Sequence, residues 1–369
     1  MKTLVLGGYG NFGTRICRAL AFEPSIDIVI GGRDLSRSQA LAASIGGSAT
    51  GVALDHTKTD FSETLKQLGI ELLIHTAGPF QQQDYQVAQA AAKAGTHYID
   101  LADGRRFVCD FSNSLDDDFR TAGCIAISGA STVPALSSAV VDHLCKGLQR
   151  IDSIDICIAP AQSAPRGKAT LAAVLSYCGE SLQVWNEGAW QSLRGWASPQ
   201  PVQFKRLQSR KGALCDIPDL ELFPKYYNVT QRVMFRAAVE VDIAQSAFAV
   251  LAKLRAWGIL PDLSRLASLL NFTAPALDFL GSALGGMFVR VAGMNSDGAV
   301  VKRAWHIAAD NDHGPEIPCM AAIMLARKIA TKQMLTTGAF SCVSMLELKE
   351  FELEFKKWNM TTDIVDEII

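Results

Sequence analysis

The sequence lacks the short motifs that mark several common enzyme classes. It contains no Gly-x-x-x-x-Gly-Lys phosphate loop, no His-Glu-x-x-His pair and no Gly-x-Ser-x-Gly turn. The Tyr-x-x-x-Lys pair of short-chain dehydrogenases is also absent. Six histidines and nine scattered cysteines show no metal-ligand spacing, so we expect no metal site. These absences exclude the commonest phosphate-loop, metalloprotease and serine hydrolase architectures.

The sequence has no excess of charge of either sign. It has 35 Lys and Arg against 37 Asp and Glu, and no basic stripe, so we expect a small-molecule partner and no nucleic acid. The cysteines form no Cys-x-x-Cys pair, and their odd number argues against a complete disulfide framework. The apolar run 4–6 is too short for a signal peptide. We therefore expect a cytoplasmic protein with reduced thiols.

Long hydrophobic runs are scarce as well. The most apolar stretch, 266–294, is interrupted by Asn271, Pro275 and Asp278, and no unbroken part approaches the roughly 20 residues of a spanning helix. We interpret it as two buried helices. Contact with a membrane surface or a lipid-like substrate stays open as the alternative, although the residues favour it less.

What is present predicts a folded chain of two domains. The 369 residues correspond to two domains at about 150 residues each. Hydrophobic residues make up 49% and charged residues 20%, which excludes disorder as the main state. Up to residue 130, short apolar runs alternate with helix-like stretches, which predicts a doubly wound α/β domain with a parallel sheet. The expected strands are 2–6, 26–30, 51–54, 72–75, 97–101 and 124–127.

The turn after the first expected strand matches Gly-x-Gly-x-x-Gly. Gly8 allows the tight turn, Gly10 lets the backbone approach a pyrophosphate, and Gly13 lets the following helix pack closely on the strand. Asn11 and Phe12 lie in the first helical turn, whose amide groups and dipole would stabilise the phosphates. Because the pattern follows a strand and opens a helix, it predicts a dinucleotide site.

The end of the second expected strand indicates which dinucleotide is bound. A site for NAD places an acidic residue about 20 residues after the glycines, but Arg33 stands there. A guanidinium at this position pairs bidentately with a 2′-phosphate, and Arg37 and Ser36 could contact the same group. We therefore predict NADP(H), with NAD(H) as the less favoured alternative. We also expect Ser36 to cap the next helix with Gln39, while Asp34 could face the helix N-terminus.

Two further loops are candidate cofactor contacts. Asp55 ends the third expected strand and could accept from the adenine amino group or cap its own loop. Ala77, Gly78 and Pro79 follow the fourth strand at the expected switch point, where small residues let the ribose and phosphates pass.

No catalytic residue can be assigned from the sequence. Asp100 and Asp103 follow the fifth strand and are candidates for acid–base chemistry or substrate orientation. His75 lies in an apolar strand and is expected to be a core residue. His313 precedes a helix and is either a proton shuttle or a surface-loop residue.

The second half has a different pattern, which predicts an α+β domain over 131–369 with a mixed or antiparallel sheet. Hairpins are expected around 184–190 and over 287–307, where Asn295-Ser296-Asp297-Gly298 forms the turn. A helix over 316–332 could pack back on the first domain, which would otherwise consist of 1–130.

In its motifs the chain resembles the saccharopine dehydrogenase-like (saccharopine reductase) oxidoreductases of bacteria. The motifs that carry the resemblance are the glycine turn, Gly32-Arg33-Asp34, His75-Thr76-Ala77-Gly78-Pro79-Phe80, Ala94-Gly95-Thr96-His97-Tyr98-Ile99-Asp100-Leu101, Gly129-Ala130-Ser131-Thr132-Val133-Pro134, Gly314-Pro315-Glu316-Ile317-Pro318 and Gly338-Ala339-Phe340-Ser341-Cys342.

The resemblance implies an NADP-dependent oxidoreductase with a Rossmann domain and a substrate domain through which it dimerises. It implies no particular substrate, because a shared fold does not transfer a reaction. We expect hydride transfer to or from a small or moderately apolar substrate. Two alternatives remain: a dinucleotide-binding sensor or scaffold without turnover, and a lipid-related reductase at a membrane surface.

Overall fold

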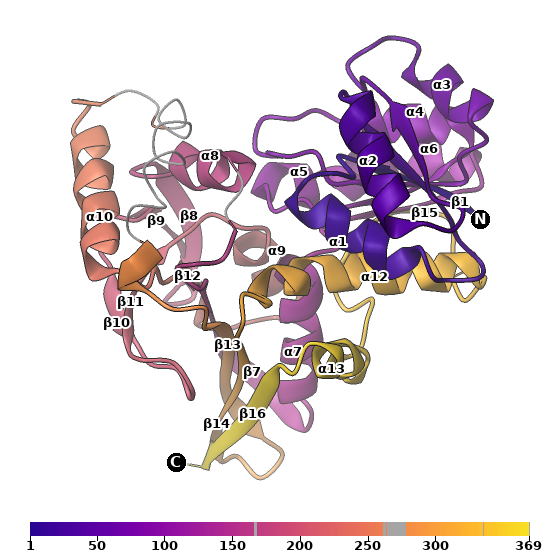
Figure 1. Ribbon diagram of the computed structural model, residues 1–369. Coiled ribbons are helices and arrows are strands. Elements are labelled where there is room, and N and C mark those ends of the chain that lie inside the picture. The colour runs from indigo at the N-terminus through magenta and orange to yellow at the C-terminus, as the bar shows by residue number, and fades with distance from the viewer. Residues whose placement is uncertain (166–167, 261–262, 264–277, 335, 369) are drawn as a thin grey trace. The chain divides into compact units, whose positions relative to one another are not determined.

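The computed structural model describes residues 1–165, 168–260, 263, 278–334 and 336–368 (Figure 1). They form two compact units, each built from two separate stretches of chain. The first unit consists of Met1–Ala135 and Glu316–Val343. The second consists of Leu136–Pro315 and Ser344–Ile369.

The first unit is built on a seven-stranded sheet in which every pair of neighbouring strands is parallel. Its strand order is β15-β6-β5-β4-β1-β2-β3, so the order reverses between β1 and β4. The strands are β1 (Lys2–Leu6), β2 (Asp27–Gly32), β3 (Thr50–Ala53), β4 (Leu72–His75), β5 (His97–Asp100), β6 (Ile125–Ser128) and β15 (Gly338–Ser341).

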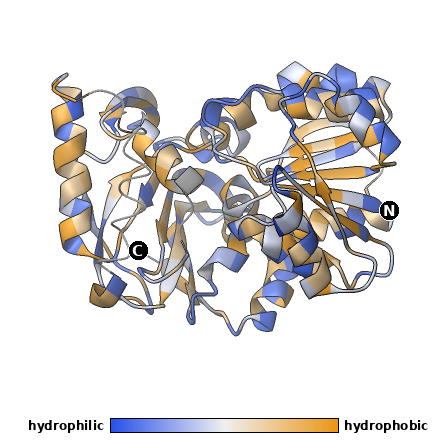
Figure 2. Ribbon diagram, turned by 45° about the horizontal axis from the view of Figure 1, so that its top comes forward, coloured by the Kyte–Doolittle hydropathy of each residue, from blue (hydrophilic) through white to orange (hydrophobic). Residues whose placement is uncertain are grey.

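Burial explains why these short runs become central strands. Leu4 and Val5 on β1 and Leu72, Leu73 and Ile74 on β4 are fully buried, so both faces of the sheet are covered. Figure 2 shows the apolar strands of this sheet between helices that carry both polar and apolar residues. The predicted doubly wound α/β domain is confirmed, and each of the six strands expected from the sequence lies within about two residues of its predicted position.

The crossovers are helical. Helix α12 packs beside α1, while α4 contacts both α3 and α6. The helices of the first unit are α1 (Asn11–Leu20), α2 (Leu35–Ile45), α3 (Phe61–Gln67), α4 (Gln86–Ala94), α5 (Arg105–Cys109), α6 (Phe111–Thr121) and α12 (Ile317–Ala330).

The structure corrects two details of this unit. Helix α2 begins one residue before Ser36, and its N-cap is Asp34, whose side chain accepts a hydrogen bond from the Arg37 amide. The expected cap at Ser36 is therefore wrong, because Asp34 takes the N-cap two residues earlier and Ser36 already lies inside the helix. Residues 338–341, expected in the second domain, form β15 and pair with β6.

The second unit contains a seven-stranded mixed sheet in the order β10-β11-β12-β7-β13-β14-β16. Strand β12 pairs with β7 in parallel, and the other neighbouring strands are antiparallel. The sheet is therefore mixed, which is one of the two arrangements that the sequence predicted. Strands β8 and β9 form a separate hairpin. The strands are β7 (Leu148–Ala159), β8 (Ser181–Asn186), β9 (Ala189–Arg194), β10 (Gln200–Val202), β11 (Arg210–Leu214), β12 (Arg232–Ala237), β13 (Gly285–Asn295), β14 (Val300–Ala309) and β16 (Thr361–Ile368).

Helices cover the apolar face of this sheet. Helix α7 packs on β13 and β14, and Trp305 of β14 contacts Phe355 of α13. Within the described residues, the α-helices of the unit are α7 (Ser137–Leu144), α8 (Lys168–Ser176), α9 (Asp219–Tyr226), α10 (Asp242–Ala256) and α13 (Leu348–Lys357).

The apolar stretch 266–294 is described only in part. Residues 264–277 lie outside the described residues, and from Gly285 onward the chain is strand β13, so the expectation of a buried helix is wrong there. No helix within the described ranges is long and apolar enough to cross a membrane. All nine cysteines lie in the described part of the chain and are free thiols.

Candidate functional site

The turn between β1 and α1 has room for glycine only at positions 7, 8 and 13. Gly7 has φ +79°, a conformation that side chains rarely adopt. A Cβ atom on Gly8 would lie 2.8 Å from the Val5 carbonyl oxygen, and one on Gly13 would lie 2.3 Å from the Gly7 carbonyl oxygen. The backbone of the turn is therefore closely packed against itself and against the strand.

The open side of this turn presents backbone amides. The Gly7 and Gly8 amides donate to the Gly31 carbonyl of β2, at 2.9 and 3.1 Å. In α1, the hydrogen bonds of the helix begin with the Thr14 amide, which donates to the Gly10 carbonyl at 3.0 Å. The amides of residues 11–13 precede it and form the positive end of the helix, whose first turn carries no acidic residue.

The first turn of α1 is anchored through Arg15. Its Nη1 donates to the carbonyl and the side-chain oxygen of Asn11, at 2.7 and 2.6 Å. Its Nε lies 2.8 Å from Glu316 Oε1, next to α12. The Cys319 thiol donates to the Phe12 carbonyl at 3.6 Å. The returning segment thus fixes the helix end that presents the amides.

Two exposed arginines lie at the carboxyl end of β2. Arg33 immediately follows the strand, and Arg37 and Ser36 lie in the first turn of α2, with all three side chains exposed. Asp34 occupies the N-cap, so its carboxylate is engaged with the α2 backbone. The structure therefore presents two guanidinium groups and no competing free carboxylate from Asp34.

Tyr9 joins these two parts of the site, and the sequence analysis did not single it out. A Cβ atom on Gly32 would lie 2.3 Å from the Tyr9 ring, so the ring lies directly on the end of β2. The Tyr9 hydroxyl accepts from the Asp34 amide at 3.2 Å, and the Arg37 guanidinium lies over the ring. The signal in the sequence was an aromatic residue inside the glycine turn together with two glycines at the end of β2.

Asp55 follows β3 and is held within its own loop. Its carboxylate accepts from the Thr57 amide at 3.1 Å and the Thr57 hydroxyl at 2.7 Å. These hydrogen bonds hold the pKa of Asp55 below its ordinary value of 3.8. The structure thus shows the loop-capping role, and contact with adenine stays a prediction.

The loop after β4 is held by one glutamine. Gln83 Nε2 donates to the Ala77 and Pro79 carbonyls, at 2.8 and 2.9 Å, and Gly78 lies between them. A Cβ atom on Gly7 would meet Thr76 Oγ1 and the Ala77 amide nitrogen. This loop and the glycine turn are therefore in contact at the carboxyl edge of the sheet.

Asp100 closes the same edge at β5. Its Oδ1 accepts from the Ala102 amide, the Ser128 hydroxyl and the Gly129 amide, at 2.9, 3.0 and 2.8 Å. Complete burial raises its pKa to about 6, although these hydrogen bonds act in the opposite direction. Asp100 therefore connects the exits of β5 and β6 and is not a surface acid.

The remaining candidates have structural partners. His75 is buried, its Nδ1 lies 3.0 Å from the Tyr98 hydroxyl, and burial lowers its pKa to about 3, as expected of a core histidine. Asp103 accepts from Gln81 Nε2 at 2.9 Å. His313, in the second unit, has its Nδ1 3.1 Å from the Trp358 carbonyl oxygen. Within the described ranges, no three His, Cys, Asp or Glu side chains gather to hold a metal ion.

The fold and this edge define a Rossmann-type protein with a glycine cradle at the point where the strand order reverses. Residues 3–127 match the model of the saccharopine dehydrogenase NADP binding domain. This match confirms the predicted resemblance and, by the name of the domain, the predicted cofactor NADP. No curated protein sequence matches the chain.

Solved structures agree on the fold. Apo saccharopine dehydrogenase (L-Glu forming) from Saccharomyces cerevisiae is similar over 99% of both chains, with a TM-score of 0.74 and 13% identity. Homospermidine synthase from Legionella pneumophila in complex with NAD has a TM-score of 0.60 and 11% identity, over 99% of this chain and 90% of that one. An engineered D-amino acid dehydrogenase bound to NADP+ has a TM-score of 0.51 and 14% identity, over 93% of both chains. The family domain supports an oxidoreductase, and these neighbours show the fold.

Proposed function

We propose that the protein is an NADP(H)-dependent oxidoreductase that transfers hydride to or from a small or moderately apolar substrate. The observation that carries the proposal is the pairing of a closely packed glycine turn with exposed Arg33 and Arg37 at the end of β2. The amides of residues 11–13 would hold the pyrophosphate, and the two guanidinium groups would hold the 2′-phosphate. When bound, the nicotinamide supplies the hydride chemistry.

The other residues of the site have supporting roles in this proposal. Gly8, Gly10 and Gly13 let the turn pack closely, so that its backbone can approach the pyrophosphate, and Ser36 donates to the 2′-phosphate. Ala77, Gly78 and Pro79 border the ribose and phosphates, because their loop contacts the glycine turn. Asp55 contacts the adenine through the carboxylate oxygen that its own loop leaves available.

Cofactor preference tests the proposal. NADPH and NADH are titrated into the natural protein and into Arg33→Ala and Arg37→Ala, with binding followed by calorimetry. Each substitution removes a charge-assisted contact, so we expect NADPH affinity to fall roughly tenfold with NADH affinity unchanged. Arg106→Ala is the control, because Arg106 is exposed and pairs with Asp110 on α5. An unchanged ratio of the two affinities would overturn the assignment.

Turnover is tested separately. NADPH oxidation is followed with a panel of imines, ketones and enoyl compounds, since the dehydrogenase neighbours act on different substrates. Steady oxidation with any of them supports an enzyme and contradicts a sensor or scaffold. Cofactor binding without turnover on the whole panel favours the latter.

A lipid-related substrate is the second candidate, and several exposed apolar side chains favour it. Trp257, Ile259, Phe279 and Leu280 of the second unit have exposed fractions between 50% and 81%. Large exposed apolar groups are typical of contact with apolar partners. Co-sedimentation with anionic liposomes tests this, and binding should decrease in Trp257→Glu and Leu280→Glu. Binding that both variants retain would remove the candidate.

A further inference from the structure

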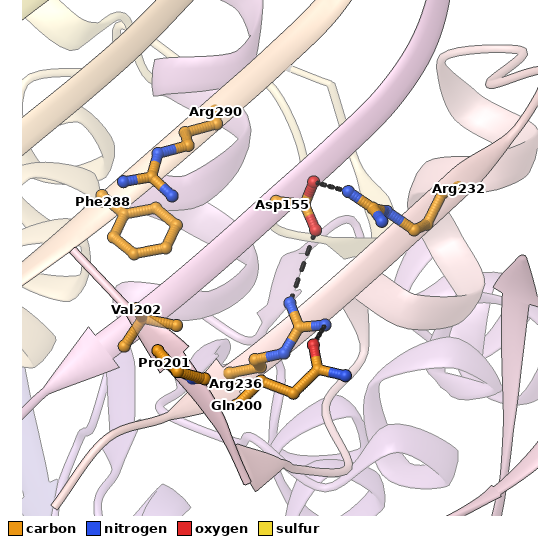
Figure 3. Close-up of a pocket in the computed structure, with 8 residues that line it drawn as sticks. All are labelled: Asp155, Gln200, Pro201, Val202, Arg232, Arg236, Phe288 and Arg290. Carbon is orange, nitrogen blue, oxygen red and sulfur yellow. Dashed lines mark hydrogen bonds and ion pairs between the residues drawn. The ribbon is translucent and has the colours of Figure 1, made fainter. Parts of the chain in front are cut away.

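The second sheet has one face that helices bury and another that carries charge. On β7, Ile154 and Ile156 are buried, and Asp155 between them points to the opposite face. The strand register places Arg290 of β13 opposite Asp155. It also places Arg232 and Arg236 of β12 on the same face as Asp155. Three arginines from the two strands on either side of β7 thus lie around one carboxylate (Figure 3).

Two of these arginines are oriented by Asp155. Arg232 Nη2 donates to Asp155 Oδ2 at 2.5 Å. Arg236 Nη1 lies 3.5 Å from Asp155 Oδ1, and its Nη2 donates to Gln200 Oε1 at 3.3 Å. Because the side chains stand on strands and not on loops, the cluster is preorganised.

The third arginine is oriented by an aromatic ring and a carbonyl group. The Arg290 guanidinium lies 3.9 Å from the centroid of the Phe288 ring, and its Nη2 donates to the Gln203 carbonyl at 2.5 Å. The four charged side chains border a cavity of about 180 Å³, with Pro201 and Val202 at its edge (Figure 3).

The charges at this cavity do not cancel. Arginine stays ionised in proteins, so the three guanidinium groups exceed the one carboxylate by two positive charges. In the part of the chain that the structure describes, Arg232 Nε finds no hydrogen-bond acceptor although it is shielded from solvent. A bound dianion would balance the excess charge and supply that acceptor.

We propose that this cavity binds a phosphate group. Arginine matches phosphate with parallel N–H···O hydrogen bonds, and a phosphate dianion carries the two charges that are missing. The volume is below the roughly 300 Å³ of ordinary ligand pockets and suits a phosphate group better than a whole nucleotide. A second cavity of about 180 Å³ is also lined by Asp155, Arg232 and Arg290, and it adds Lys302. The phosphate is therefore either free or part of a small monoester that extends into this second cavity.

Calorimetric titration with inorganic phosphate at pH 7.5 tests the site. It is run with and without saturating NADP, so that phosphate bound at the dinucleotide cradle is recognised. We expect at least a fivefold loss of affinity in Arg236→Gln and in Arg290→Gln, and no binding in the double variant. Arg150→Gln is the matched control, because Arg150 is exposed on β7 and pairs with Asp152. Glycerol phosphate replaces phosphate in a second series, and tighter binding identifies a monoester.

Three results would overturn the proposal. They are the absence of phosphate binding in the natural protein, an equal loss in Arg150→Gln, and a preference for succinate over phosphate. A change in sedimentation in the arginine variants with phosphate affinity retained would instead assign the face to self-association. Thermal unfolding checks that each variant is folded. Because Arg33 is remote in sequence and lies in the first unit, Arg33→Ala should leave this site intact, so the two proposals fail independently.

Discussion

The Arg37 guanidinium lies over the Tyr9 ring, with 4.4 Å between its central carbon and the ring centroid. The ring rests on Gly32 at the end of β2, and its hydroxyl accepts from the Asp34 amide. Tyr9 therefore connects the glycine turn with the residues that would distinguish NADP from NAD.

Replacing Tyr9 by alanine should weaken NADPH binding about two- to fivefold, because Arg37 loses a cation–π contact of about 0.5–1 kcal/mol at an exposed site. NADH binding should change less. Tyr9→Phe keeps the ring and is the control, so its NADPH affinity should stay near that of the natural protein. Equal losses in the two variants, measured by fluorescence titration, would contradict the role of the ring.

Gly13→Ala should destabilise the first unit and abolish tight cofactor binding. The new methyl group would lie 2.3 Å from the Gly7 carbonyl oxygen, and backbone must move to relieve it, at a cost of about 1–3 kcal/mol. Gly314→Ala is the control, since a Cβ atom there meets nothing within 4 Å. Calorimetric unfolding should show a lowered Tm for Gly13→Ala alone, and an unchanged Tm would refute the close packing.

Asp100 should make stability depend on pH. Burial raises its pKa from 3.8 to about 6, so the folded protein holds the proton more tightly than the unfolded chain. Its contribution is complete below about pH 4 and is lost as the pH rises through 6, which amounts to roughly 3 kcal/mol. Asp100→Asn should flatten the dependence of Tm on pH between 4 and 6.

Asp219 supplies an internal comparison. Burial raises its pKa to about 7, so Asp219→Asn should flatten the same profile up to a higher pH. If Asp100→Asn kept the full slope of the natural protein between pH 4 and 6, Asp100 would not be the group that titrates.

The ion pair between Arg15 and Glu316 should stabilise the first unit. Both side chains are mostly buried, and removing one charge leaves the other poorly solvated, so Glu316→Gln should cost about 2 kcal/mol. Glu63→Gln on α3 is the control, because its pair with Lys66 is exposed. An equal change of Tm in the two variants would show that the Glu316 pair adds no more stability than the exposed pair.

The sequence was most informative where neighbours along the chain determine the structure. The glycine turn, the strands and the second hairpin could be predicted, because apolar periodicity and turn residues act locally. The helix cap at α2 was misassigned because Asp34 and Ser36 are both good capping residues, and only the observed hydrogen bond to Arg37 decides between them.

What could not be predicted depends on residues distant in sequence. Strand β15 completes the first sheet only because β6 offers a free edge, and no local pattern indicates that partner. The arginine cluster brings together Asp155, Arg232 and Arg290 from three strands. The alternation of apolar and polar residues along a strand shows which face of the sheet a side chain is on, but not which other strand lies beside that strand.

The late position of β15 in the sequence has a consequence for biosynthesis. The ribosome makes the first six strands of this sheet early, but their partner at the β6 edge only after residues 136–315 of the second unit have been synthesised. Until residue 338 emerges, the nascent chain carries an unpaired strand edge of the kind that invites aggregation. Helix α12 and Glu316, which pairs with Arg15, belong to the same late segment, so the cofactor cradle acquires this support only after residues 136–315 have been made.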